Sequence, residues 1–216
     1  AALLERMDLA KTGLVMVGDH NQLPSVGPGN VLRDIVTHSL APVARLTKIH
    51  RQGGALRTNA ADVLRGRIAH GRDPHSGWVV LDDLKDPLDI QACVRDLVSV
   101  HIPQHLGFDP VADVQILTPT HKGPLGTREL NSLLQRIFHP GKIDGRFVPG
   151  DKVIQKVNDY DFNLMNGTMG RVVELDGKSV VFDFDGVGQL KLMGEKLQHV
   201  ELAYAISIHK SQGSEF

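Results

Sequence analysis

Cysteine, aromatic residues and net charge are all scarce in this chain of 216 residues. Cys93 is its single cysteine, which excludes an internal disulfide framework and fits a reducing, cytoplasmic compartment. No run of about 18 apolar residues is present to span a membrane. The formal net charge of −1 argues against a globally basic nucleic-acid binder. The composition is that of a globular protein, and the length predicts one or two domains.

The stretch Val17–Gly29 is rich in glycine, proline and small polar residues, and it directly follows the apolar run Leu14–Val17. We expect that run to form a buried strand and Val31–Val36 to form a helix with Asn30 as its N-cap. Ligands of open α/β sheets bind where strands end, so Gly18, Asp19 and Gln22 are candidate site residues. The alternative is an ordinary strand–turn–helix connection.

Basic residues cluster between Arg45 and Arg72, with Asp62 as the one acid among them. We expect a short strand at Arg45–Thr47 and a helix at about Ala55–His70. Arg51 follows the strand beside a glycine pair, where a guanidinium can reach a phosphate with two hydrogen bonds. Arginines 57, 65 and 67 are better explained as a solvated helix face.

Val114–Leu117 is a second predicted buried strand, and it leads into Thr118–Gly126 and then a helix at Arg128–Ile137. Thr118, Thr120, His121 and Lys122 carry hydroxyl and cationic donors suited to a nucleic-acid backbone. A plain connecting loop is the alternative. Upstream of it, the patterns predict a strand at Trp78–Leu81 and a helix at Leu88–Val100.

Residues 147–198 have the short, closely spaced β-rich runs of a small antiparallel barrel or sheet. The predicted strands are Lys152–Val157, Arg171–Leu175, Ser179–Phe184 and Gln189–Leu192, separated by Asn-Gly or Asp-Gly turns. Asn158 and Tyr160 are candidates for contact with a nucleic acid, although packing across strands explains Tyr160 equally well.

A last apolar strand, predicted at Leu202–Ile206, ends in Ser-Ile-His-Lys-Ser-Gln-Gly-Ser-Glu-Phe216. In this run His209 and Lys210 offer donors to phosphates, Gly213 permits close approach, and Glu215 suits a ribose hydroxyl. A solvated turn is a poorer explanation of the whole string. His101 and His105 have the spacing of a metal pair, but Pro103 lies between them and no third ligand is near, so we predict no metal site.

Three of these strings resemble motifs of superfamily 1 helicases. Gly-Asp-x-x-Gln-Leu-Pro-Ser-Val-Gly-Pro-Gly resembles motif III of the RecD branch, and the string from Thr118 resembles a motif of its second motor domain. Tyr-Ala-x-Ser-Ile-His-Lys-Ser-Gln-Gly-Ser-Glu-Phe resembles its motif V. The resemblance implies an α/β fold, a RecA-like P-loop NTPase motor with an inserted SH3-like β-barrel. The implied domains are 1–50 (end of the first motor domain), 51–146 (second motor domain), 147–199 (insertion) and 200–216 (return to the second motor domain).

The resemblance also implies roles for individual residues. Gln22 and Arg51 would be catalytic, as the γ-phosphate sensor and the arginine finger. The ATP-binding set would be Gly18, Asp19, Gln22, Arg51, Gly213 and Glu215, and the DNA-binding set Thr118, Lys122, Asn158, His209 and Lys210. The implied cofactor is ATP with Mg²⁺, and the implied partners are single-stranded and duplex DNA, with RecB- and RecC-like subunits left open.

No Gly-x-x-x-x-Gly-Lys-Ser/Thr phosphate loop and no acidic Mg²⁺ motif occur in the sequence. Residues 1–10 also lack a helix start, and the family's next arginine motif is expected just beyond Phe216. We therefore expect a segment of a 5′→3′ DNA helicase of recombination or repair that does not hydrolyse ATP alone, with its Mg²⁺ ligands outside this chain. The alternatives are a conjugative or RNA-directed motor of the same superfamily and a non-catalytic nucleic-acid clamp.

Overall fold

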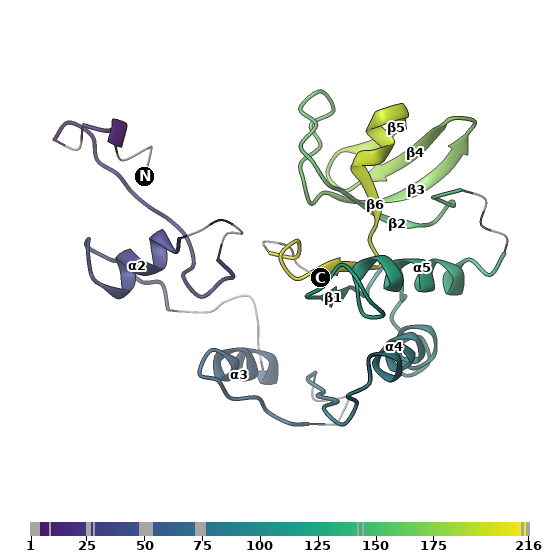
Figure 1. Ribbon diagram of the computed structural model, residues 1–216, viewed down its shortest axis with the longest axis horizontal. Coiled ribbons are helices and arrows are strands. Elements are labelled where there is room, and N and C mark those ends of the chain that lie inside the picture. Colours follow the sequence, from purple (N-terminus) through teal and green to yellow (C-terminus); the bar gives the residue numbers. More distant parts are fainter. Residues whose placement is uncertain are drawn as a thin grey trace. The chain divides into compact units, whose positions relative to one another are not determined.

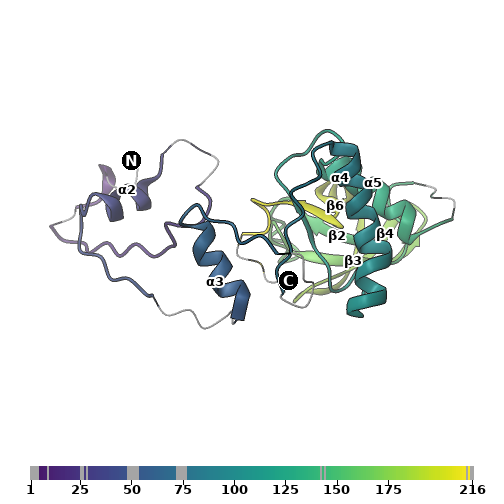
Figure 2. The same cartoon turned by 90° about the horizontal axis from the view of Figure 1, so that it is seen from below.

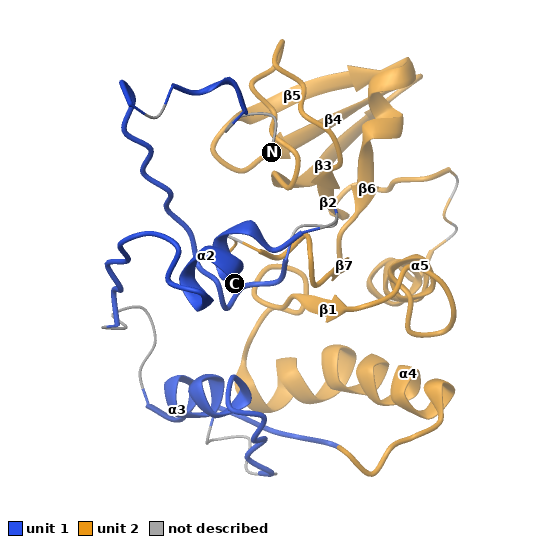
Figure 3. Cartoon of the chain, turned by 60° about the vertical axis from the view of Figure 1, so that its left-hand side comes forward, with its two compact units in different colours: residues 1–81 blue, residues 82–216 orange. Residues whose placement is uncertain are grey.

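The computed structural model describes residues 5–8, 10–24, 27, 29–47, 54–71, 77–141, 143, 145–212 and 214. The chain divides into two compact units, residues 1–81 and residues 82–216, which Figure 3 colours separately. The domain boundaries predicted from the sequence stay predictions.

Unit 1 contains two helices of more than one turn among its described residues. Helix α2, Val31–Thr37, confirms the predicted helix, although the Asn30 side chain makes no capping hydrogen bond. Helix α3, Gly54–Val63, begins where predicted but ends seven residues earlier, ahead of Gly66 with its positive φ of 72°. A residue in the left-handed region is a common end for a helix, and glycine adopts that conformation without strain.

Three short strands predicted in this unit are absent. Leu14–Val17, Arg45–Thr47 and Trp78–Leu81 do not form strands, and Val17 and Leu46 are almost fully exposed, at 94% and 101%. The predictions were wrong because a strand persists only with a hydrogen-bonded neighbour, whatever its own β-propensity. None of the strands that the structure describes pairs with these segments.

Unit 2 opens with helix α4, Pro87–Asp96, which continues as the π-type helix η2, Leu97–Leu106. Asp86 caps α4 by accepting a 2.8 Å hydrogen bond from the Leu88 amide, and Pro87 occupies the first turn, where its missing N–H costs nothing. The helix predicted at Leu88–Val100 is thus confirmed, but it runs on past Pro103 and stops at Gly107, whose φ is 71°.

A parallel pair of strands forms the α/β part of unit 2. Strand β1, Ile116–Thr118, pairs with strand β7, Ala205–Ser207, and helix α5, Thr127–Phe138, packs against β7. These elements confirm the strand and helix predicted on either side of the Thr118–Gly126 loop. Parallel pairing of strands so far apart in sequence is the α/β arrangement that was expected.

The remaining strands form a five-stranded antiparallel sheet in the order β5-β4-β3-β2-β6. Their bounds are Lys152–Gln155 (β2), Met169–Asp176 (β3), Ser179–Phe184 (β4), Gly188–Met193 (β5) and Val200–Leu202 (β6), with the short helix η3, Gly194–His199, before β6. Four of these strands match the predicted runs. The turns after β3 and β4 contain Gly177 and Gly186 with positive φ, as Asp-Gly hairpins require.

The predicted strand Leu202–Ile206 is in fact two strands that belong to different sheets. Leu202 ends β6, which pairs with β2, whereas Ala205 begins β7, which pairs with β1. Ala203 and Tyr204 lie between them and are buried, with 0% and 3% of their surfaces exposed. One continuous apolar run therefore crosses from the antiparallel sheet to the parallel pair.

Three apolar clusters hold unit 2 together. The largest packs in the five-stranded sheet and consists of Phe147, Val153, Leu164, Val172, Val180, Phe182, Phe184, Leu192 and Val200. A second joins Val98 of η2, Leu134 of α5 and Tyr204, and a third joins Ile154 of β2 to Ala203 and to Ile206 of β7. Figures 1 and 3 show the five-stranded sheet on one side of α5 and β1, with α4 on the other, and Figure 2 shows α4 and α5 adjacent. No described helix has the length and apolarity needed to cross a membrane.

Candidate nucleic-acid interface

Strands β1 and β7 end at the same edge, and each continues into a polar loop. Thr118 and Ser207 are direct partners at the ends of the two strands. The first residue past β7, Ile208, donates its amide to the Thr118 carbonyl at 3.1 Å. The two loops predicted to bind nucleic acid, Thr118–Gly126 and 207–212, are therefore fixed to each other at their roots.

The Thr118–Gly126 loop is closed by its own hydrogen bonds. The Thr118 hydroxyl donates to the Leu125 carbonyl at 2.6 Å, and Thr118 is buried. Gln91 of α4 donates to the Pro124 carbonyl at 2.5 Å. A Cβ on Gly126 would lie 2.6 Å from the Lys122 backbone nitrogen, so the loop is too tight for any other residue there. Lys122 itself is exposed.

The loop after β7 forms a helical turn. The amides of Lys210 and Ser211 both donate to the Ser207 carbonyl, at 2.9 and 3.2 Å, and the Lys210 amide also reaches the Ser207 hydroxyl at 3.3 Å. His209 is exposed, whereas Lys210 is mostly buried. This turn presents donors at the edge that the Thr118–Gly126 loop shares.

A groove of about 480 Å³ lies beside these loops. Its lining residues come from the two loops, from α5, from the segment between α5 and β2, and from strands β2, β6 and β7. They include His121, Arg128, Arg146, Glu201, Ser207 and Lys210. Glu201 is the one acid among the described residues that line it. Arg146 donates to the carbonyls of Leu197 and Val200, so its guanidinium is occupied by the protein itself.

Glu201 is bound by two lysines from different segments. Its Oε1 lies 3.0 Å from Lys156 Nζ, and its Oε2 lies 3.8 Å from Lys210 Nζ. Burial opposes ionisation of this carboxyl, but the hydrogen bond from Lys156 and the charges of both lysines outweigh it and lower the pKa of Glu201. Burial lowers the pKa of Lys210, and the Glu201 carboxylate partly offsets that effect.

Asn131 of α5 holds strand β7 by both ends of its amide. Its Nδ2 donates to the Ala205 carbonyl at 2.8 Å, and its Oδ1 accepts from the Ala205 amide at 2.9 Å. Asn131 and Ala205 are both buried. The outer side of β7 thus gains, from one side chain, the two hydrogen bonds that a further strand would supply.

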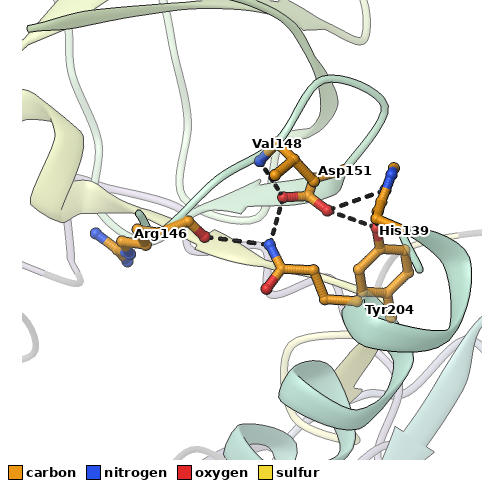
Figure 4. Close-up of polar contacts among 6 residues, drawn as sticks. His139, Arg146, Val148, Asp151 and Tyr204 are labelled. Atoms are coloured by element: carbon orange, nitrogen blue, oxygen red, sulfur yellow. Dashed lines mark hydrogen bonds and ion pairs between the residues drawn. The ribbon is translucent and has the colours of Figure 1, made fainter. Parts of the chain in front are cut away.

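A buried carboxylate, Asp151, joins the five-stranded sheet to the link between β6 and β7 (Figure 4). It accepts hydrogen bonds from the Tyr204 hydroxyl at 2.7 Å, from Gln135 Nε2 at 2.7 Å and from the Val148 amide at 2.8 Å. His139 Nε2 lies 3.3 Å from the same carboxylate. Burial, with the neighbouring Asp151, raises the pKa of the Tyr204 phenol. The cluster is a fully bonded polar joint.

Asn158 and Tyr160 lie in the segment between β2 and β3. The Asn158 side chain accepts from the Asn166 amide at 2.8 Å and donates to the Tyr160 hydroxyl at 3.2 Å, while 76% of Tyr160 is exposed. Lys196 of η3 holds the same segment through Asp159, at 2.9 Å, and through the ring of Phe162, whose centroid is 4.1 Å away. The segment is therefore held in place by these contacts, and it exposes the Tyr160 ring.

In unit 1, Gly18, Asp19 and Gln22 are exposed. Asp19 accepts a 2.9 Å hydrogen bond from the Asn21 amide, which makes a tight turn that turns the chain toward α2. A Cβ on Gly18 would lie 2.7 Å from Leu32 Cδ2, so α2 makes the close approach there. Arg51, Gly213 and Glu215 lie outside the described residues.

The structure thus gathers Thr118, Lys122, His209 and Lys210 on two joined loops and keeps Asn158 on a separate segment of the same unit. Sequence reasoning missed Glu201, Arg128 and the structural roles of Asn131 and Asp151. One signal was available, because Asn131 and Gln135 are polar residues four apart on the buried, leucine-rich face of α5.

No described residues form a group of three or more side chains suited to a metal ion. His101 and His105 stack with ring centroids 5.7 Å apart.

Comparison with known proteins gives consistent matches. A family profile described as an AAA domain matches residues 1–80. The ATP-dependent RecD2 DNA helicase of Deinococcus radiodurans is 36% identical over 213 residues, which are 94% of this chain and 27% of that protein. The RecBCD enzyme subunit RecD of Mycolicibacterium smegmatis is 31% identical over 230 residues, covering 100% of this chain and 40% of the subunit.

Among solved structures, the Pif1 helicase from Bacteroides in complex with ADP-AlF3 and single-stranded DNA aligns with 79% of this chain and 43% of its own. The TM-score is 0.49 and the sequence identity 17%. The chain spans well under half the length of both curated relatives.

Proposed function

Because the chain is homologous over nearly its whole length to a segment of RecD-like superfamily 1 helicases, we propose that it forms part of an ATP-dependent DNA helicase. That protein translocates 5′→3′ on single-stranded DNA and unwinds duplexes in recombination or repair. Single-stranded and duplex DNA are its substrates, and RecB- and RecC-like subunits are candidate partners because one relative is named as a RecBCD subunit.

The observation that carries this proposal is the pair of polar loops at one edge of β1 and β7. Thr118 and Ser207 end paired parallel strands, and the Ile208 amide bonds back to the Thr118 carbonyl, so the two loops are joined where they begin. Donors on a shared edge can follow a phosphate backbone, and such contacts position a strand without reading its sequence. We assign DNA contact to Lys122, His209 and Lys210 through their side chains. Since the Thr118 hydroxyl serves the loop, we assign Thr118 a supporting role there.

Asn158 and Tyr160 extend this interface. An exposed aromatic ring can stack on an unpaired base regardless of its identity, and such a contact is worth about 1–3 kcal/mol per base. The hydrogen bond from Asn158 to the Tyr160 hydroxyl would orient the ring. We propose that this segment contacts the strand and that the five-stranded sheet behind it is the SH3-like insertion of the family.

Nucleotide binding is assigned to the residues that match the family's motifs. Gly18, Asp19, Gln22, Arg51, Gly213 and Glu215 would contact ATP. An arginine aimed at the γ-phosphate stabilises the charge of the transition state. The phosphate loop and the Mg²⁺ ligands would come from residues outside this chain, so the chain alone is not expected to hydrolyse ATP.

A strand-displacement assay of the longer helicase tests the proposal. Duplexes with a 5′ tail, a 3′ tail or an RNA tail are offered with ATP and Mg²⁺. We expect unwinding of the 5′-tailed DNA only. Preference for the RNA tail would favour an RNA-directed motor, and nicking beside an origin-like sequence would favour a conjugative one. Salt-dependent binding of single-stranded DNA without unwinding would identify a non-catalytic clamp.

A further inference from the structure

Glu201 is unusual among the residues that line the groove beside the two loops, because its carboxylate faces groups that a DNA phosphate would be expected to contact. The described lining of the groove includes His121, Arg128, Arg146 and Lys210 as basic residues and Glu201 as its single acid. Glu201 lies opposite Ile154 across the β2–β6 ladder, and both residues line the groove. An acid at this position weakens the attraction of the groove for any polyanion.

The carboxylate uses its two oxygens on two different lysines. Oε1 is 3.0 Å from Lys156, which follows β2, and Oε2 is 3.8 Å from Lys210, which follows β7. A phosphodiester likewise offers two anionic oxygens. Lys156 and Lys210 are each about two-thirds buried, and Glu201 is about half-buried, so the lysines are held near their positions while solvent and ligands can still reach the cluster.

We propose that Glu201 acts as an internal substitute for a DNA phosphate, holding Lys156 and Lys210 in the absence of DNA and yielding them to the strand when it binds. This inference rests on the DNA-binding function proposed above and names the residue that sets the strength of that binding. The carboxylate keeps the two ammonium groups positioned. It also makes the groove release a strand more readily, since it competes with each phosphate for the same donors.

Glu201→Gln tests this directly, because glutamine keeps the shape and removes the charge. Binding of a fluorescent oligothymidylate by the 216-residue chain is measured by anisotropy across a salt series. We expect the variant to bind about three- to tenfold more tightly at low salt, the size of effect expected for one partly exposed charge. The logarithmic salt dependence should steepen by about 0.7 for each further phosphate that the lysines contact.

Glu195→Gln is the matched control, because Glu195 is an exposed acid on η3 that does not line the groove. If the effect depends on a charge inside the groove, Glu195→Gln should keep the affinity within about twofold of the wild type and leave the salt slope unchanged. Adding Lys156→Gln to the Glu201→Gln variant should remove most of the gain. The unfolding midpoint of each variant confirms that the chain is folded.

Unchanged or weaker DNA binding by a folded Glu201→Gln variant would overturn the inference while leaving the proposed function intact. An equal gain in the Glu195→Gln control would also overturn it, because the effect would then come from net charge alone. If neither the wild type nor the Glu201→Gln variant binds the oligonucleotide, the DNA-binding function itself fails.

Discussion

The Tyr204 hydroxyl donates a 2.7 Å hydrogen bond to Asp151, a carboxylate with none of its surface exposed. Tyr204 lies between β6 and β7, where the chain passes from the antiparallel sheet to the parallel pair, and Asp151 directly precedes β2. The bond therefore ties that crossing point to the sheet it has just left. Since α5 contributes Gln135 to the same carboxylate, the sheet, the helix and the crossing point share one joint.

Replacing Tyr204 with Phe should destabilise the chain by about 1–3 kcal/mol, because the buried carboxylate loses a donor that nothing replaces. Urea unfolding followed by circular dichroism measures the difference. Tyr160→Phe is the control, since Tyr160 is largely exposed and should change stability by less than about 0.5 kcal/mol. Equal effects of the two substitutions would contradict the role given to the Asp151 joint.

The same phenol predicts a loss of stability in alkali. Burial, together with Asp151, holds the pKa of Tyr204 above its ordinary value of 10.0, so above that pH the unfolded chain releases a proton that the folded chain keeps. The unfolded state then binds fewer protons, and the free energy of unfolding falls as the pH rises. The stability gap between wild type and Tyr204→Phe should narrow between pH 8 and about pH 11. A gap independent of pH would show that Tyr204 ionises alike in both states.

Asn131→Ala should cost about 2–4 kcal/mol, because it leaves the amide and the carbonyl of Ala205 buried without partners. Hydrogen exchange gives the sharper measurement. The Ala205 amide should lose its protection, while amides in β4 keep theirs. Ser132→Ala, the next position on α5, is the control and should leave Ala205 protected. Retained protection in Asn131→Ala would mean that β7 holds its place without the helix.

Lys122→Gln should weaken binding of single-stranded DNA and reduce the logarithmic salt slope by about 0.7, the contribution of one phosphate contact. The measurement is anisotropy at several salt concentrations. Lys178→Gln removes the same charge from the exposed β3–β4 turn and should have no such effect on the slope. If both variants lose the same affinity, the Thr118–Gly126 loop is not the contact surface.

The strands of the antiparallel sheet were predictable because their information is local. Ser179–Phe184 alternates and is bounded by Asp-Gly turns, and β4 has these same limits in the structure. Leu14–Val17 carries an equally apolar signal, yet it forms no strand, because no described strand lies beside it to pair with. The break at Ala203–Tyr204 was also invisible, since both sides of it are apolar and the change of sheet depends on partners distant in sequence.

In the candidate site, too, features set by the local sequence were predicted and features set by distant partners were not. Donors at strand ends, such as Lys122 and His209, were found from the sequence because turn chemistry marks the ends of strands. Glu201 was missed, since its importance arises only when Lys156 and Lys210, 45 and nine residues away, meet its carboxylate in space. The role of Asp151 was missed as well, since three of the groups that meet its carboxylate, from Gln135, His139 and Tyr204, are 12 or more residues away in sequence.

ATP hydrolysis, measured with and without single-stranded DNA, tests the central claim most directly. The assay compares this chain with a version extended on both sides along its parent sequence. We expect the extended protein to hydrolyse ATP, to be stimulated by single-stranded DNA and to lose that activity in Arg51→Ala, while the 216-residue chain stays inactive. Turnover by the pure 216-residue chain, or an extended protein that binds DNA but never hydrolyses ATP, would contradict the assignment to a helicase motor.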